Sequence, residues 1–369
     1  MNSKKRILVA PLDWGLGHAT RCIPIIRELG KHDCEVIVAA DGRPYELLKR
    51  EFPSLMMVRL PGISISYPEK GNMALGIIMQ FPSIIASILR EHRAMKKIHK
   101  ELRIDGIVSD NRFGLFTKKI PSVYVTHQIA IEMPRSFLWA SQFVRWLHKA
   151  VIRRYTECWI PDFDGEKNLS GKLSHGFALP KNAKFVGPLS RMERISAPSQ
   201  EYEILVVLSG PEPQRTVFEN MLVEQLKFIP QKTLLVRGIP EKNQRIRISD
   251  SCIVVSHLDS DALNKAMAAA AIIIARPGYS TIMDLDALGK KAILIPTPGQ
   301  TEQEYLAQRF RELKIFFTCE QKEFVLEKAL KKIEDFSGLS SPMTNHSLLI
   351  SAIDRFVALC NREISAALK

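Results

Sequence analysis

Cysteine is scarce in this chain, and the six present stand far apart in the sequence: Cys22, Cys34, Cys158, Cys252, Cys319 and Cys360. No CxxC pair occurs, so the spacing gives neither a zinc ribbon nor the disulfide framework of a small secreted domain. The first residues lead directly into a short strand-like run and contain no signal-peptide apolar region. We therefore expect a protein of a reducing, cytoplasmic compartment.

Long hydrophobic runs and nucleic-acid-binding motifs are also missing. No stretch reaches the ~18 uninterrupted apolar residues of a membrane-spanning helix. The sequence has no zinc finger, RNP aromatic motif or recognisable helix-turn-helix. The net charge is nevertheless +13, with a pI near 9.5. Because a basic chain attracts anionic partners, we expect a phosphorylated small molecule or an anionic membrane surface, and no nucleic acid.

The composition indicates a globular protein of two domains. At 369 residues the chain is too long for one typical core, and its residues are 46% hydrophobic and 25% charged. Short apolar runs alternate with helical patterns, which predicts an α/β fold. A stretch rich in proline and serine, with Pro188, Ser196, Pro198 and Ser199, indicates the linker. We expect an N-terminal domain over residues 1–190 and a C-terminal domain over 200–344. The helix at 345–369 is a candidate to pack back onto the first domain.

The most informative stretch, residues 272–298, predicts a strand, a tight turn, a helix and a second strand. The apolar run Ile272–Ala275 is long enough for a buried strand, and the following Arg-Pro-Gly prevents its continuation. Thr281 and Asp284 have the spacing of a capping box, and Gly289 is a good helix stop. The helix N-terminus would lie at the carboxyl edge of a parallel sheet, where anions, phosphates above all, bind.

A second glycine turn follows the first predicted strand, Arg6–Pro11. Gly15, Gly17 and His18 precede a helical pattern that ends at Gly30. The glycines let a ligand approach the backbone closely, and a histidine held near a sheet edge can act as a base at neutral pH. A glycine pair alone is as often an ordinary turn, so a purely capping histidine stays open.

Polar residues follow two further predicted strands of the N-terminal half. Asp110, Asn111 and Arg112 end the first, and His127 and Gln128 end the second. Because α/β sheets bind ligands at the carboxyl ends of their strands, these side chains are candidates for one cleft. Each alone could be a loop residue bonded to backbone. We expect a helix between the two strands.

Two stretches combine apolar with basic residues. Met73–Leu89 is strongly apolar, is interrupted at Pro82 and is followed by positive charges, while Phe137–Arg154 interleaves aromatic and cationic residues. Half-buried helices would explain both patterns. The alternative is an apolar face with a basic rim resting on lipid, which would place the protein peripherally on the inner face of the cytoplasmic membrane.

On these motifs the chain resembles glycosyltransferases of the GT-B fold. It is most similar to the branch that contains the peptidoglycan lipid II N-acetylglucosaminyltransferase and the plant galactolipid synthases. The most specific match is RPGYSTIMDLDALGKKAILIPTP at 276–298 with QTEQEYLA at 300–307, and GLGH adds a looser N-terminal match. The resemblance implies two Rossmann-like domains facing across a cleft. It implies a hexosyl- or N-acetylhexosaminyltransferase that uses a nucleotide-sugar, UDP-linked, with inversion, without a metal and without another cofactor.

The resemblance also implies roles for individual residues. His257 and Leu258 would frame the uracil ring, and Asp284 would meet the ribose hydroxyls where the family usually has a glutamate. Glu302 and Gln303 occupy the place of two glutamines that read the donor sugar. Because glutamate only accepts hydrogen bonds, the identity of the sugar stays open. The residues implied in donor binding are Gly17, Arg191, Ser209, Gly210, His257, Leu258, Gly278, Ser280, Thr281, Asp284, Glu302 and Gln303.

The implied chemistry needs two things. The charge that grows on departing UDP can be met by a helix N-terminus and an arginine, without a metal ion. The acceptor hydroxyl needs a base, for which His18 is preferred over Asp110. The acceptor, a glycan, a lipid or a membrane-associated molecule, would contact Asn111, Arg112, His127 and Gln128.

Three alternatives stay open. A UDP-sugar hydrolase of the same fold resembles the GLGHATRC stretch, with the histidine activating water, and UDP-sugar 2-epimerases share the fold. A non-catalytic, basic membrane-surface protein is the third.

Overall fold

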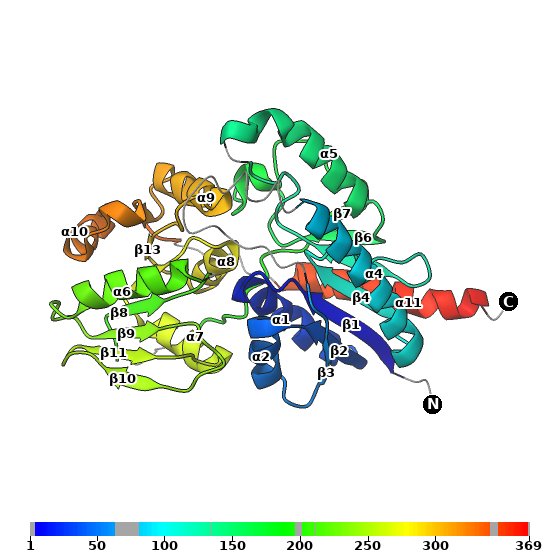
Figure 1. Cartoon of the computed structure of the whole chain (residues 1–369), viewed down its shortest axis with the longest axis horizontal. Helices are drawn as coiled ribbons and strands as arrows, with labels where there is room; N and C mark the ends of the chain where they lie inside the picture. The colour runs from blue at the N-terminus through cyan, green and yellow to red at the C-terminus, as the bar shows by residue number, and fades with distance from the viewer. Residues whose placement is uncertain are drawn as a thin grey trace. The chain divides into compact units, whose positions relative to one another are not determined.

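The structure is a computed structural model that describes residues 4–62, 81–133, 135–195, 201–210, 212–339 and 346–367. The apolar residues 73–80 and the linker residues Ser196, Pro198 and Ser199 lie outside this part. The chain forms two compact units (Figure 1). The first comprises Met1–Trp14, His18–Leu189 and Asn345–Lys369, and the second comprises Gly15–Gly17 and Ser190–Thr344.

The first unit is built on a seven-stranded sheet with the order β3-β2-β1-β4-β5-β6-β7, in which all neighbouring strands are parallel. Pro11 of β1 pairs with Asp110 of β4, so these two strands end at the same edge. The strands are β1 Lys5–Pro11, β2 Cys34–Ala40, β3 Met56–Arg59, β4 Gly106–Asp110, β5 Ser122–Val125, β6 Glu157–Ile160 and β7 Ala183–Phe185. The helices are α1 Leu16–Lys31, α2 Gly42–Glu51, α4 Phe81–Leu102, η1 Arg135–Ala140, α5 Ser141–Ile152, η2 Gly171–Leu173 and α11 Ser347–Ala367.

Of the apolar stretch 73–89, the structure describes the part from Phe81 onward, where α4 begins. Pro82 lies in the first turn of this helix, where its missing N–H removes no helical hydrogen bond. One expectation for the first unit is wrong. Residues 111–121 form a loop with no helix. That loop is held from outside, because Tyr155 Oη donates to the carbonyl of Arg112 at 2.6 Å and Gly114 N donates to Glu91 at 3.2 Å.

The last helix, α11, packs on the first unit. His32 Nε2 lies 2.8 Å from the Asp354 carboxylate, and Phe356 meets the ring of Trp159 edge-on. A side chain at Gly106 of β4 would come within 2.7 Å of Phe356 and Cys360. The glycine therefore lets the helix lie directly against the strand.

The second unit has a seven-stranded sheet of its own, with the order β10-β11-β9-β8-β12-β13-β14. Only β10 is antiparallel to its neighbour among these described strands. The strands are β8 Ile204–Val207, β9 Thr233–Val236, β10 Arg245–Arg247, β11 Cys252–Val255, β12 Ile272–Ala275, β13 Ala292–Leu294 and β14 Phe317–Thr318. The helices are α6 Gln214–Leu226, α7 Ser260–Ala269, α8 Tyr279–Leu288, α9 Thr301–Glu312, η3 Gln321–Glu323, α10 Leu326–Lys332 and η4 Ile333–Asp335.

Helix α8 begins earlier than the capping-box spacing predicts. Its N-cap is Gly278, and no described side chain caps it, so the prediction that Thr281 caps the helix is wrong. The Asp284 carboxylate instead accepts from Ser190 Oγ at 2.6 Å. The predicted stop is confirmed: Gly289 is the C-cap, with a left-handed φ of 63° that glycine adopts without strain.

In the described part of the chain, no helix combines the length and the apolar character needed to cross a bilayer.

Candidate active site

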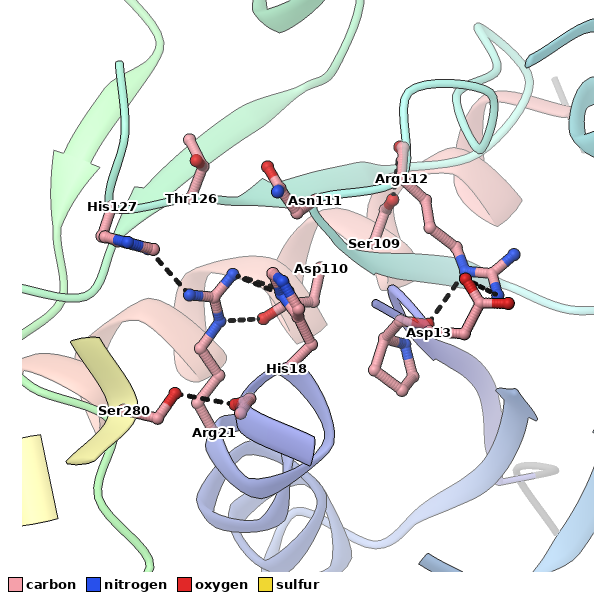
Figure 2. A network of polar contacts seen from close by, with 12 residues as sticks. Asp13, His18, Arg21, Ser109, Asp110, Asn111, Arg112, Thr126, His127 and Ser280 are labelled. Atoms are coloured by element: carbon pink, nitrogen blue, oxygen red, sulfur yellow. Dashed lines mark hydrogen bonds and ion pairs between the residues drawn. The ribbon is translucent and has the colours of Figure 1, made fainter. Parts of the chain in front are cut away.

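Charged and imidazole side chains gather at the carboxyl edge of the first sheet (Figure 2). His18 and Arg21 come from the first turns of α1, Asp110 is the last residue of β4, and His127 follows β5. Because β1, β4 and β5 are parallel neighbours, their carboxyl ends meet at this edge. The structure brings together three of the expected residues and adds Arg21.

Asp110 is fully buried and is held on both oxygens. Its Oδ1 lies 2.6 Å from His18 Nδ1 and 2.6 Å from Arg21 Nη2, while Arg21 Nε contacts Oδ2. Burial would raise the pKa of this carboxyl, but the opposing charge of Arg21, helped by His18, holds the pKa below its usual value. We therefore correct the expectation that Asp110 is an alternative base, because an ionised carboxylate with both oxygens occupied orients its neighbours instead.

The position of the proton on His18 follows from this contact. Nδ1 of His18 lies 2.6 Å from the Asp110 carboxylate, which only accepts hydrogen bonds, and 2.9 Å from Nη2 of Arg21, which only donates. Because Nη2 already donates to Oδ1 of Asp110 at 2.6 Å, we assign the hydrogen to Nδ1 of His18, which donates it to Asp110 along the shorter contact. Nε2 then keeps a lone pair, and none of the described residues hydrogen-bonds to it. Burial, followed by the charge of Arg21, lowers the pKa of His18, and Asp110 only partly offsets them. The ring is 18% exposed, and its neutral form is the one suited to accept a proton near pH 7.

His127 holds the opposite tautomer. Its Nδ1 lies 2.9 Å from Nη1 of Arg21, which can only donate, so Nδ1 accepts and the ring hydrogen sits on Nε2. Asn111 has a left-handed φ of 56°, which asparagine tolerates, and its amide oxygen accepts from Tyr124 Oη at 2.8 Å. Gln128 is half-buried, and its backbone N–H donates to Thr126.

Arg112 is not placed to meet a ligand, which corrects the expectation that it binds an acceptor. Its side chain is fully buried, and its three nitrogens donate at 2.8–2.9 Å to the Pro11 carbonyl, Glu91 and the Leu60 carbonyl. An arginine enclosed in this way ties β1, α4 and the chain after β3 together. Nothing in the sequence distinguishes a buried structural arginine of this kind from an arginine that faces a ligand.

The second unit presents a polar edge of its own. Ser209 and Gly210 follow β8, His257 and Leu258 follow β11, and Gly278 follows β12. Gly210 has a φ of 105°, a conformation open to glycine but strained for other residues. The backbone N–H groups of the first turn of α8, beside half-buried Ser280 and Thr281, form a surface of the kind that binds phosphate.

The remaining donor-binding candidates are partly engaged inside the second unit. Burial raises the pKa of Asp284 to about 6, although Arg191 and Ser190 favour its ionised form. Arg191 Nη1 donates to Ser260 Oγ at 3.2 Å. The side-chain oxygen of Gln303 accepts from Thr297 N at 2.8 Å, which fixes the orientation of its amide group. Glu302 is half-buried in the first turn of α9.

The family model described as Glycosyltransferase family 28 C-terminal domain matches residues 220–352. This range covers most of the second unit, including the Gly278 turn and α8. The resemblance predicted from the 276–307 motif is therefore confirmed for the C-terminal half.

Two curated relatives illustrate the sequence similarity. A UDP-N-acetylglucosamine--N-acetylmuramyl-(pentapeptide) pyrophosphoryl-undecaprenol N-acetylglucosamine transferase of Thermoanaerobacter sp. (strain X514) is 30% identical over 154 residues. These residues are 37% of this chain and 42% of that protein, so the match spans less than half of the relative's length. The protein of the same description from Histophilus somni (strain 129Pt) is 20% identical over 351 residues, 91% of this chain and 90% of that protein.

Solved structures resemble the chain over its whole length. The glycotransferase of kitacinnamycin superposes with a TM-score of 0.61 at 14% identity, covering 99% of this chain and 98% of that one. MurG of Acinetobacter baumannii has a TM-score of 0.55 at 12% identity, covering 96% and 100%. The likeness confirms the predicted fold class, an α/β chain with two Rossmann-like domains of the GT-B type.

Proposed function

We propose that this protein is a glycosyltransferase that moves a hexose or N-acetylhexosamine from a UDP-sugar to a lipid-linked or other membrane-associated acceptor. The observation that carries the proposal is the contact of His18 Nδ1 with Asp110 Oδ1, at 2.6 Å. It gives the first unit an oriented, neutral imidazole at the edge where α/β sheets bind ligands. The family match of residues 220–352 supports the second unit as the donor-binding domain.

The donor diphosphate would be bound by backbone amides at the start of α8. The positive end of that helix and the guanidinium of Arg191 are suited to the charge that develops on departing UDP. In this proposal they do so without a metal ion. Asp284 would accept from a ribose hydroxyl with the oxygen not bonded to Ser190.

The transfer is a single displacement. The acceptor oxygen forms a bond to the anomeric carbon, the bond between that carbon and the diphosphate oxygen breaks, and UDP leaves with the electron pair. The hydroxyl proton passes to Nε2 of His18, and Asp110 stabilises the resulting imidazolium. Attack opposite the leaving group inverts the anomeric configuration.

A membrane-associated acceptor is suggested by the surface of η1 and α5. Four large apolar side chains there are exposed, with Trp139 81% accessible, and Arg153 and Arg154 lie at the C-terminal end of α5. We call Leu138, Trp139, Phe143 and Trp146 the aromatic surface. Aromatic rings beside cations suit the interface of an anionic bilayer, which would place the protein peripherally on the inner face of the cytoplasmic membrane. The relatives described above act on a pyrophosphoryl-undecaprenol acceptor.

The experiment that tests the proposal measures UDP release from a panel of UDP-sugars, with and without undecaprenyl-pyrophosphoryl acceptors in vesicles. We expect release that depends on both one donor and an acceptor. Release at the same rate without acceptor would favour the UDP-sugar hydrolase, an alternative that the transferase descriptions of the relatives do not support. If no nucleotide shifts the melting temperature, the protein would not bind a donor and the proposal would fail.

A further inference from the structure

The transfer mechanism described above gives no role to Arg21, although this arginine lies at the centre of the His18 cluster. Its side chain is 2% exposed, and its guanidinium reaches three groups from three elements. Nη2 and Nε hold the two oxygens of Asp110, Nη1 donates to Nδ1 of His127, and Nη2 lies 2.9 Å from Nδ1 of His18. A buried cation so placed acts on all the titratable groups around it.

The charges in this cluster balance only while His18 is neutral. The charged and titratable groups that face His18 are Arg21 on its own helix, Asp110 on β4 and His127 after β5. Arg21 and Asp110 contribute one positive and one negative charge. A proton on His18 would leave two positive charges beside the single carboxylate of Asp110, and the repulsion from Arg21 in this largely buried cluster disfavours that state.

Removing Arg21 would reverse this balance. Asp110 would then be a buried anion in contact with a neutral ring, and protonation of His18 would neutralise it. The fork of the guanidinium matters as well as its charge, because bidentate contact turns Oδ1 of Asp110 toward Nδ1 of His18. Lysine would keep the charge and lose the fork.

We infer that Arg21 is a positioning residue that keeps His18 unprotonated, with its hydrogen on Nδ1 and its lone pair on Nε2. The catalytic meaning of the inference rests on the proposed function, but the inference itself concerns only the protonation state and tautomer of His18. It therefore predicts a quantity that can be measured whether or not the protein transfers a sugar.

The test is a ¹⁵N NMR titration of the imidazoles in the full-length protein, with the signal of His18 assigned by its loss in His18→Gln. In the unsubstituted protein we expect the Nδ1–H tautomer and no protonation at neutral pH. In Arg21→Met we expect the midpoint of His18 protonation to rise by about one pH unit or more. Asp110→Asn should move it in the opposite direction, since only the cation remains.

Two further variants separate charge from geometry and from loss of folding. Arg21→Lys should leave the midpoint within a few tenths of a unit but lower kcat, and Lys31→Met removes a charge from the exposed end of the same helix and should change neither. If Arg21→Met fails to fold, the double variant Arg21→Met/Asp110→Asn is compared with Asp110→Asn, and the midpoint of His18 protonation should be higher in the double variant because the repelling cation is gone.

The inference is overturned if His18 titrates at the same pH in Arg21→Met as in the unsubstituted protein, or if its hydrogen sits on Nε2. Equal midpoints in the double variant and in Asp110→Asn would overturn it as well, because removing Arg21 would then have had no effect on His18. A normal titration pattern in a protein that releases no UDP would contradict the proposed function alone.

Discussion

At the scale of single residues, His18 is the group on which the proposed transfer depends. Replacing it with glutamine retains a polar side chain but removes the proton acceptor. We expect His18→Gln to lower the acceptor-dependent kcat by about 10²–10⁴-fold, the usual contribution of a general base, while calorimetry shows UDP affinity unchanged. His32→Gln is the matched control, because His32 follows the last turn of α1 and bonds to Asp354. Wild-type turnover in His18→Gln would mean that the base lies elsewhere.

Asp284 predicts a pH dependence of stability. Burial raises the pKa of Asp284 to about 6, above the ordinary value of 3.8 that it has in the unfolded chain. Between these values the native state holds a proton that the unfolded state has released, so this group's contribution to stability falls as the pH rises through that window. Asp284→Asn keeps an oxygen for Ser190 and carries no charge. We therefore compare the unfolding free energy of Asp284→Asn with that of the unsubstituted protein at each pH. The difference in favour of the variant should increase by on the order of 1–3 kcal/mol between about pH 4 and pH 7.

Urea unfolding at both pH values measures this difference. Asp261→Asn, an exposed carboxylate in the first turn of α7, should show no comparable gain. An equal gain in the two variants would mean that Asp284 is not a destabilising buried charge.

At the same scale, the sequence indicated His18 but not Arg21. The glycine turn and the position of the histidine at a helix start predicted a reactive group at a sheet edge. Arg21 is three residues further on, which places it on the same face of α1, and that spacing is the signal that could have revealed it. Its pairing with Asp110 spans 89 residues and depends on tertiary packing that no local pattern encodes.

At the scale of elements, substitutions at the two ends of α8 distinguish nucleotide binding from helix stability. A Cβ at Gly278 would meet only Thr281 Oγ1, at 3.9 Å, so Gly278→Ala should fold normally. That methyl group would stand at the N-terminus where we propose the diphosphate binds, and we expect the Kd for UDP to rise about tenfold or more. Gly289→Ala is the converse case. Because residue 289 has a left-handed φ of 63°, alanine there is strained, and we expect the unfolding free energy of this variant to fall by about 1 kcal/mol. Its affinity for UDP should be unchanged.

Calorimetry with UDP and thermal unfolding on both glycine variants would test this pair. Loss of UDP affinity in the Gly289 variant but not in the Gly278 variant would contradict a diphosphate site at the start of α8.

The aromatic surface on η1 and α5 carries the prediction for membrane contact. Trp139→Ser and Trp146→Ser should each weaken binding to anionic vesicles by about tenfold or more, because each buries a large ring in the interface. Phe228→Ser is the control, since Phe228 is 84% exposed but belongs to the second unit. Vesicle co-sedimentation measures the three variants, and equal losses in all of them would show that exposed apolar residues bind vesicles without regard to position.

Elements with continuous apolar runs were predictable, and those set by packing were not. β1 and β12 follow from local sequence, because buried parallel strands are apolar throughout. β10 is exposed along its length and β14 has two residues, so neither produces a pattern. The sequence predicts a helix between β4 and β5, but the shape of the loop at 111–121 depends on contacts with Glu91 and Tyr155, which lie far away in the sequence.

At the scale of the whole molecule, two Rossmann-like sheets each present polar residues at the carboxyl ends of their strands. The alternation of apolar runs and helical patterns was enough to predict this plan. The chemistry was less accessible, because His18 and Asp110 lie 92 residues apart and their contact exists only once β1 and β4 are neighbours. The donor-binding half was recognisable because its motif is local, from the Arg-Pro-Gly turn through α9.

The most direct measurement of the central claim is the ¹H NMR spectrum of the anomeric proton in the product formed from a UDP-α-sugar and a lipid-linked acceptor. A base-assisted single displacement predicts a glycoside of β configuration on the acceptor, formed by the unsubstituted protein and about 10²–10⁴-fold more slowly by His18→Gln. A spectrum that shows only free reducing sugar beside UDP, or an α-linked product, would contradict the account.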